Sequence, residues 1–117
     1  MAQIDWKQFN EFFQYYDKEI ITLVINIYIE EYDERMSTLE KNILDKDLKN
    51  LKKNSHSFKG VVLNFQAPYV AKLLQSLEDM AEEKQEEHIP ETFEELKKPS
   101  KELLNELVEY LKTSHLR

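Results

Sequence analysis

The single glycine of this chain limits the folds that its sequence can adopt. The 117 residues include one Gly, three Pro and no Cys, whereas an average composition of about 7% Gly would give roughly eight glycines. Sandwiches, small barrels and nucleotide-binding βα loops need residues that tolerate positive φ or a close backbone approach. With 33% charged and 41% hydrophobic residues, the sequence predicts an all-α globular protein. We expect residues 1–117 to form a single domain.

Charge and hydropathy narrow the partners and the cellular location. The net charge of −7 disfavours nucleic acid and anionic membranes, because phosphate groups repel an acidic protein. The longest apolar stretch, Ile20 to Ile29, is interrupted by Thr22 and Asn26 and is about half the ~20 residues that a membrane span needs. Acidic residues in the opening segment argue against a signal peptide. We therefore expect a soluble, cytoplasmic protein without disulfides or thiolate metal sites.

Apolar residues at intervals of three and four predict helices over about residues 5–16 and 18–44, from Asp45 or Asp47 to about Phe65, over about 68–87, and from the Pro90 region to about 113. Asp17, Asp45 and Asp47 are N-cap candidates. Pro99 either kinks the last helix or begins a separate one. Four long amphipathic helices with short connections predict an antiparallel up-down four-helix bundle, with the short extra N-terminal helix as a lid.

Each helix has one predicted core face. The core positions are Ile21, Ile25, Tyr28, Tyr32, Met36 or Arg35, Leu39 and Ile43; Leu48, Leu51, Ser55, Phe58, Val62 and Phe65; Val70, Leu73, Leu74, Leu77, Met80 and Ala81; and Phe93, Leu96, Leu103, Leu104, Leu107, Val108 and Leu111. Ile20, Leu23 and Ile27 form a second apolar stripe on the long helix. We expect the short first helix to cover this stripe, unless part of it stays exposed for a partner.

Among the three histidines, His56 alone lies in the middle of a predicted helix, whereas His88 is beside a helix break and His115 is near the end of the chain. At 100° per residue, His56 points about 140° away from the core position Leu51, so it faces solvent. Between positions 46 and 60, five lysines stand against one acid, Asp47, a local charge of +4. The lysines are Lys46, Lys49, Lys52, Lys53 and Lys59.

The only glycine, Gly60, follows His56 by four residues, so the two share one exposed helix face. A glycine inside a helix costs about 1 kcal/mol relative to alanine. Either the helix ends at Gly60, or the missing side chain lets a large partner approach the His56 ring. Val62 and Phe65 continue the core phase beyond the glycine, which favours the second interpretation.

An exposed imidazole with nearby ammonium groups and an open approach suits phosphoryl acceptance. The lysines would disfavour a protonated ring before transfer and would stabilise a phosphoryl group of about −2 charge afterwards. Metal binding fits poorly, because no second ligand stands three or four residues from His56. Those four positions are Lys52, Lys53, Lys59 and Gly60.

The segment His56-Ser57-Phe58-Lys59-Gly60 resembles the H-x-[apolar]-K-G signature of histidine-containing phosphotransfer (HPt) domains, the four-helix bundles of two-component phosphorelays. The similarity extends over roughly Phe9 to Glu78, and Leu73, Leu77 and Glu78 match the family's spacing of leucines and a terminal acid or amide. The chain departs from the family pattern at Val61 and Val62, where small residues are usual, and at Gln66, where a second glycine is common.

The resemblance implies a role for each matching residue. His56 would be the phosphoacceptor, and Lys59 would lie beside the phosphoryl group or hold the geometry of the site. Gly60 would leave room for a receiver domain. Glu78 would hydrogen-bond near the His56 ring or pair with Lys59.

We therefore expect a phosphorelay intermediate, in which His56 takes a phosphoryl group from the aspartyl phosphate of one receiver domain and passes it to the aspartate of another. It would be a monomeric carrier rather than an enzyme, without a cofactor or metal of its own, because the receiver would supply Mg²⁺. Leu63 and the apolar part of the long helix would dock the receiver, with Lys49, Lys52 and Lys53 steering it.

Two other functions remain open at this point. One is a non-catalytic adaptor bundle that binds a signalling partner through the same face without taking a phosphoryl group. The other is a purely structural bundle or helical oligomer, which would leave Gly60 and the lysine cluster unexplained.

Overall fold

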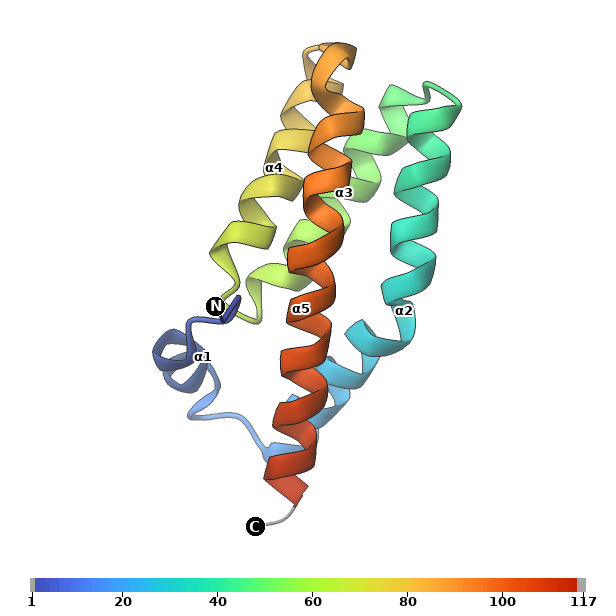
Figure 1. Ribbon diagram of the computed structural model, residues 1–117. Helices are drawn as coiled ribbons and strands as arrows, with labels where there is room; N and C mark the ends of the chain where they lie inside the picture. Colours follow the sequence, from blue (N-terminus) through green and yellow to red (C-terminus); the bar gives the residue numbers. More distant parts are fainter. Residues whose placement is uncertain (1, 116–117) are drawn as a thin grey trace.

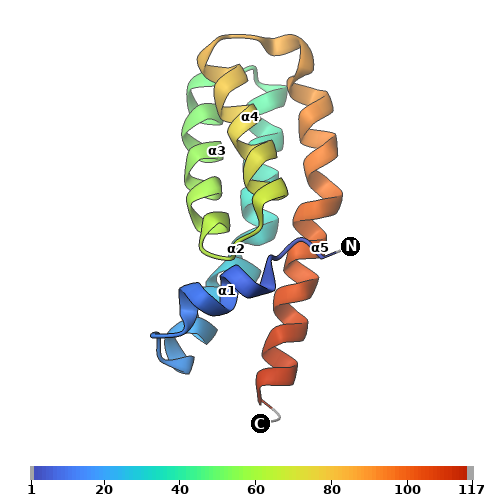
Figure 2. The ribbon, with the colours of Figure 1, turned by 90° about the vertical axis from the view of Figure 1, so that its left-hand side faces the viewer.

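Five α-helices make up most of the computed structural model, which describes residues 2–115 and side chains up to residue 113. They are α1 (Trp6–Phe13), α2 (Lys18–Leu44), α3 (Leu48–Leu63), α4 (Pro68–Glu82) and α5 (Ile89–His115), with a short 3₁₀ turn, η1 (Glu86–His88), before α5. Helices α2 to α5 run antiparallel to one another in chain order, and α1 crosses one end of the bundle (Figures 1 and 2). The prediction of an all-α four-helix bundle with an extra N-terminal helix is confirmed, and residues 2–115 contain no strand.

Three helices are followed by a residue that has a left-handed backbone conformation and is not glycine. Lys46, Gln66 and Lys84, which follow α2, α3 and α4, have φ of 55°, 57° and 58°, a region that favours glycine after a helix. Asp47 caps α3, because its Oδ1 accepts a hydrogen bond from the backbone N–H of Asn50. Asp45 instead lies at the C-terminal end of α2. The N-cap Asp17 makes no side-chain capping bond.

Several predicted helix boundaries are wrong by a few residues. The first helix ends at Phe13 rather than near position 16, the third at Leu63 rather than 65, and the fourth at Glu82 rather than 87. Pro99 lies inside a continuous α5, so no separate helix begins there. The next residue, Ser100, is buried and holds α5 to α2, because its Oγ lies 2.8 Å from the Tyr32 hydroxyl.

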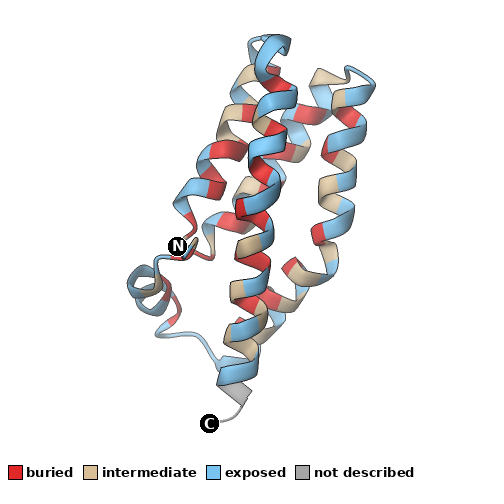
Figure 3. Cartoon of the chain, in the orientation of Figure 1, coloured by how far each residue is buried: buried red, intermediate tan, exposed pale blue. Residues whose placement is uncertain are grey.

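The core lies between α2, α3, α4 and α5, and the buried faces of the helices point inward (Figure 3). The predicted core stripes are largely confirmed, since most of their residues are buried. Six are only half-buried: Met36, Ile43, Leu48, Met80, Val108 and Leu111. Tyr28 contributes a fully buried ring that packs edge-on against the rings of Phe58 and Phe65. This packing fixes the rotation of α3, and therefore the direction of its outer face.

The expected position of the short first helix is wrong. Rather than covering the second stripe of α2, α1 packs on the C-terminal half of α5, where Trp6 stacks on Tyr110 at 5.6 Å and Phe9 lies 5.1 Å from the same ring. The preceding segment is held by hydrogen bonds from the backbone N–H groups of Gln3 and Ile4 to the Glu106 carboxylate. The stripe consequently stays 40 to 59% exposed; it comprises Ile20, Leu23 and Ile27.

Within residues 2–115, no helix combines the length and the apolar character that crossing a membrane requires.

Candidate functional site

His56 lies on the outer face of α3, with 67% of its side chain exposed. The opposite face of the same helix is buried through Leu51, Ser55, Phe58 and Val62. The core phase of α3 therefore places His56 in solvent, as the 3.6-residue periodicity predicts. His88 is also exposed, but it lies in η1, where its Nδ1 is 3.5 Å from a carboxylate oxygen of Glu91. The side chain of His115 lies outside the described residues.

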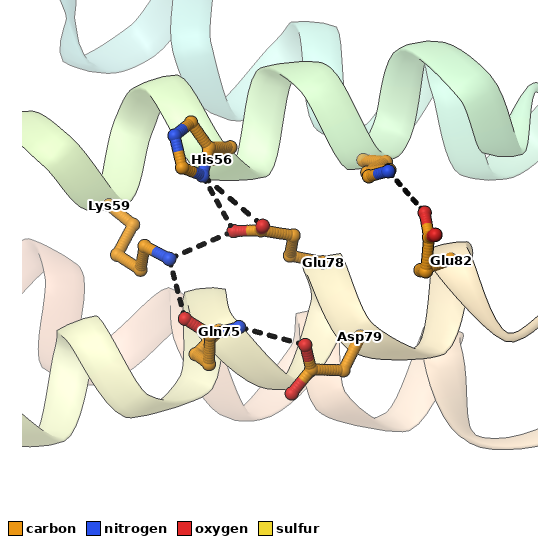
Figure 4. Close-up of polar contacts among 7 residues, drawn as sticks. His56, Lys59, Gln75, Glu78, Asp79 and Glu82 are labelled. Carbon is orange, nitrogen blue, oxygen red and sulfur yellow. Dashed lines mark hydrogen bonds and ion pairs between the residues drawn. The ribbon is translucent and has the colours of Figure 1, made fainter.

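A carboxylate from α4 contacts the His56 ring. The Nδ1 atom of His56 lies 3.1 Å from Oε1 and 3.2 Å from Oε2 of Glu78, as Figure 4 shows. An ionised carboxylate can only accept hydrogen bonds, so we assign the proton of the neutral ring to Nδ1. The unprotonated Nε2 then carries the lone pair, and Figure 4 shows it on the side of the ring away from Glu78.

The same carboxylate also binds Lys59. The Lys59 ammonium donates to Oε1 of Glu78 at 3.0 Å and to Oε1 of Gln75, and the Gln75 amide donates in turn to Oδ1 of Asp79 at 2.8 Å. The two charged side chains are mostly covered, with 15% of Lys59 and 16% of Glu78 exposed. Both contacts that the resemblance suggested for Glu78 are therefore present, one to the ring and one to Lys59.

The charge state of Glu78 reflects two opposing effects. Burial raises the pKa of the Glu78 carboxyl, but hydrogen bonds from Lys59 and His56 outweigh it, so that the pKa is lowered from its ordinary value. Glu78 is consequently ionised at neutral pH and can hold the Nδ1 proton.

The charge of +4 counted over residues 46–60 is partly compensated in the folded protein, because α4 brings acidic residues to the same site. Lys59 pairs with Glu78, and Lys52 pairs with Glu82. Among the described residues, Lys49 and Lys53 form no ion pair. A hollow of about 470 Å³ beside the ring is lined by Lys49, Lys52, Lys53, His56 and Glu78.

Gly60 lies inside α3 rather than at its end, so the interpretation that the helix stops there is wrong. Its φ is not positive, and a Cβ added to it would meet no atom within 4 Å. Neither the backbone conformation nor the packing of this chain requires glycine at that position. Leu63, three residues further on, is also exposed on α3.

Sequence reasoning missed Gln75, Asp79 and Glu82 as members of this site. Together with Glu78, they occupy spacings of three, four and seven residues along α4, which places all of them on one helix face. This polar stripe, which lies beside the apolar stripe of α4, is the sequence pattern from which these residues could have been predicted. In the described part of the chain, no group of His, Cys, Asp and Glu side chains is arranged to hold a metal ion.

The fold and the site together define a helical bundle that presents an exposed imidazole in mid-helix, with its Nδ1 fixed by a carboxylate of the neighbouring helix. A family model described as "Hpt domain" matches residues 24–114, and the chain therefore belongs to the HPt domain family. This membership supports a phosphotransfer role in two-component signalling, a setting in which HPt domains interact with receiver domains and act as phosphocarriers rather than kinases.

A solved structure is similar over nearly the whole chain. It is the histidine-containing phosphotransfer protein B (HptB) of Pseudomonas aeruginosa PAO1, which matches with a TM-score of 0.87 and 18% sequence identity over 95% of this chain and 96% of that one. At this identity the similarity shows the shared fold. No curated protein sequence gives a significant match to the chain.

Proposed function

We propose that this protein is a phosphorelay intermediate, in which His56 accepts a phosphoryl group from the aspartyl phosphate of one receiver domain and passes it to the aspartate of another. The observation that carries the proposal is the hydrogen bond between His56 Nδ1 and the ionised Glu78, on a ring that is two-thirds exposed. This bond leaves the Nε2 lone pair free and accessible, as a nucleophile requires.

The transfer step conserves atoms and charge. The Nε2 lone pair attacks phosphorus and forms an N–P bond, while the bond from phosphorus to the aspartate oxygen breaks and its electron pair stays on the aspartate. The Nδ1 proton remains in place, so the ring becomes positively charged beside the Glu78 carboxylate, which stabilises it. Transfer to the second receiver is the reverse reaction with a different carboxylate. Mg²⁺ would come from the receiver, and this chain would use no nucleotide of its own.

Docking of the receiver is proposed on exposed apolar residues of the first three helices. They comprise Phe12 and Tyr16 from α1 and the turn after it, Ile20, Leu23 and Ile27 from α2, and Leu63 from α3. Exposed apolar side chains of this kind suit a partner interface. The positive charges of Lys49 and Lys53 would steer an acidic receiver pocket toward His56, and Gly60 would let it approach the ring.

Incubation with a phosphorylated receiver domain and Mg²⁺ tests this function. The protein should gain a phosphoryl group that is labile in acid and stable in base, as phosphohistidine is. His56→Gln should take none, whereas His88→Gln, which changes the exposed histidine of η1, should be labelled like the wild type. Labelling of His56→Gln, or no labelling of the wild type by any receiver, would contradict the proposal. A receiver that binds without transferring would instead support the non-catalytic adaptor.

A further inference from the structure

The side chains of α4 form a relay that extends beyond the contact with His56. Glu78 is bound by both His56 and Lys59, Lys59 is also bound by Gln75, and Gln75 is bound by Asp79. Figure 4 shows these side chains as one chain of contacts along the groove between α3 and α4. Neither Gln75 nor Asp79 touches the His56 ring, so any effect on the ring passes through Lys59 and Glu78.

Asp79 fixes the orientation of the Gln75 amide. The NH₂ group of Gln75 donates to Oδ1 of Asp79 at 2.8 Å, which leaves the carbonyl oxygen of the amide facing the Lys59 ammonium. A flipped amide would place its NH₂ group against an ammonium that only donates and its oxygen against a carboxylate that only accepts. Gln75 therefore presents a fixed acceptor, and Lys59 is held by two acceptors on α4 rather than one.

The position of the Lys59 charge matters for the His56 ring. An ionised Glu78 without a countercharge would favour a second proton on the ring, and a doubly protonated ring has no lone pair on Nε2. Lys59 at 3.0 Å from Oε1 offsets this negative charge. The other charged groups facing the groove are Lys49, Lys52 and Lys53 from α3 and Asp79 and Glu82 from α4. From α2, Arg35 reaches the neighbouring Ser57.

We infer that Gln75 and Asp79 are positioning residues for the proposed phosphoryl transfer, because they hold the Lys59 ammonium against Glu78 and so keep the His56 ring neutral with its Nε2 lone pair available. The inference rests on the proposed function for its kinetic consequence. Its consequence for the protonation of the ring concerns the free protein alone.

Gln75→Leu tests the inference, because it removes the acceptor from position 75 while keeping a side chain of similar size. Lys59 then keeps its bond to Glu78 but is held less firmly against it, so Glu78 carries more uncompensated charge and the doubly protonated ring becomes more populated. We expect phosphoryl acceptance to slow by up to about fivefold near pH 6.5, the limit for one partly exposed charge pair. The deficit should narrow as pH rises, because fewer rings then carry a second proton.

A double variant supplies the matched control. Gln75→Glu/Asp79→Asn keeps an acceptor for Lys59 at position 75 and supplies an amide donor at position 79, and it leaves the net charge unchanged. We expect it to restore the wild-type pH profile. Circular dichroism establishes that each variant is folded. An unchanged profile in Gln75→Leu, or a deficit that is equal at every pH and is not restored by the double variant, would overturn the inference.

A measurement on the free protein separates this inference from the proposed function. Nitrogen-15 NMR of the imidazole at pH 7 reports whether the ring carries one proton, on Nδ1, or two. Gln75→Leu should raise the ratio of doubly to singly protonated ring by about two- to fivefold, and the double variant should not. An equal fraction in all three proteins would overturn the inference even if transfer occurs. A wild type that takes no phosphoryl group would overturn the proposed function and leave the NMR result to decide on the positioning.

Discussion

Replacing Gly60 by alanine separates what this glycine does for folding from what it does for a partner. The residue lies in the interior of α3 with a helical backbone, and a Cβ there would contact nothing. The difference in helix propensity, about 1 kcal/mol in favour of alanine, should therefore appear almost undiminished, since neither a steric clash nor new burial opposes or adds to it.

The magnitude can be converted into a melting temperature. Unfolding entropy of about 2.1 cal/mol/K per residue gives roughly 0.25 kcal/mol/K for a chain of 117 residues. A gain of about 1 kcal/mol should then raise Tm by about 4 °C. Thermal and urea unfolding followed by circular dichroism measure both quantities. A lower Tm for Gly60→Ala would refute the reasoning, because it would mean that the fold itself needs glycine at position 60.

The same position provides the functional half of the experiment. Gln is also a good helix former, so Gly60→Gln should be at least as stable as the wild type, while its longer side chain occupies the space beside His56 and slows phosphoryl acceptance. Ser37→Gln is the matched control, because Ser37 is exposed on α2 and lines a hollow toward α5 instead. If both variants accept the phosphoryl group at the wild-type rate, the steric role of Gly60 is wrong.

Three further predictions concern stability. The pKa of Glu78 is lowered in the folded protein, so ionised Glu78 adds stability above the unfolded glutamate pKa of about 4.3, and this contribution is lost as pH falls through the lower folded pKa. Lowering the pH from about 5 to about 3 should therefore reduce the free energy of unfolding, measured in urea, more for the wild type than for Glu78→Gln. Parallel pH dependences would contradict the assignment of a charge to Glu78. Lys84→Gly should stabilise the protein by about 1 kcal/mol, because φ at Lys84 is 58°. Lys72→Gly, at an exposed position inside α4, should instead destabilise it by a similar amount, and equal effects of the two changes in urea unfolding would exclude strain at Lys84. Tyr110→Ala removes ring contacts with Trp6 and Phe9 and should lower the free energy of unfolding by about 1–3 kcal/mol. It should also shift the fluorescence emission of Trp6, the only tryptophan, to longer wavelength. An unchanged spectrum would mean that α1 is held by other contacts.

The parts of the fold that depend on helical periodicity could be predicted from the sequence. The core phase of α3, read from Leu51, gave the exposure of His56 correctly, because tight packing leaves one rotation for an amphipathic helix. The position of α1 could not be predicted, since an apolar stripe indicates that a partner can cover it but not which helix that partner is. The apolar stripe of α2 and the side of α5 near Tyr110 were both surfaces on which α1 could pack.

The charge of the site could not be predicted for a related reason. A count of lysines near His56 considers only neighbours along the chain, whereas Glu78 and Glu82 reach the site from α4. Pairing between helices depends on their register, which hydrophobic periodicity does not determine. The ends of α3 and α4 were misplaced because Gln66 and Lys84, which follow these helices, adopt left-handed conformations that the residue type alone does not indicate.

If stability alone decided where glycine stands in this chain, its position would be different. Three helix ends adopt the conformation that glycine fits best, and none of them has glycine, while the one glycine lies in a helix that alanine would stabilise. Changes at well-separated positions add, so the natural sequence stands several substitutions below its attainable stability, as proteins commonly do. Selection of a variant library for thermal resistance alone should therefore discard Gly60 early and introduce glycines at the three helix ends. Selection of the same library for signalling should accept the helix-end glycines and retain Gly60. Selection for stability and selection for signalling would then favour different residues at position 60 and the same residues at the three helix ends.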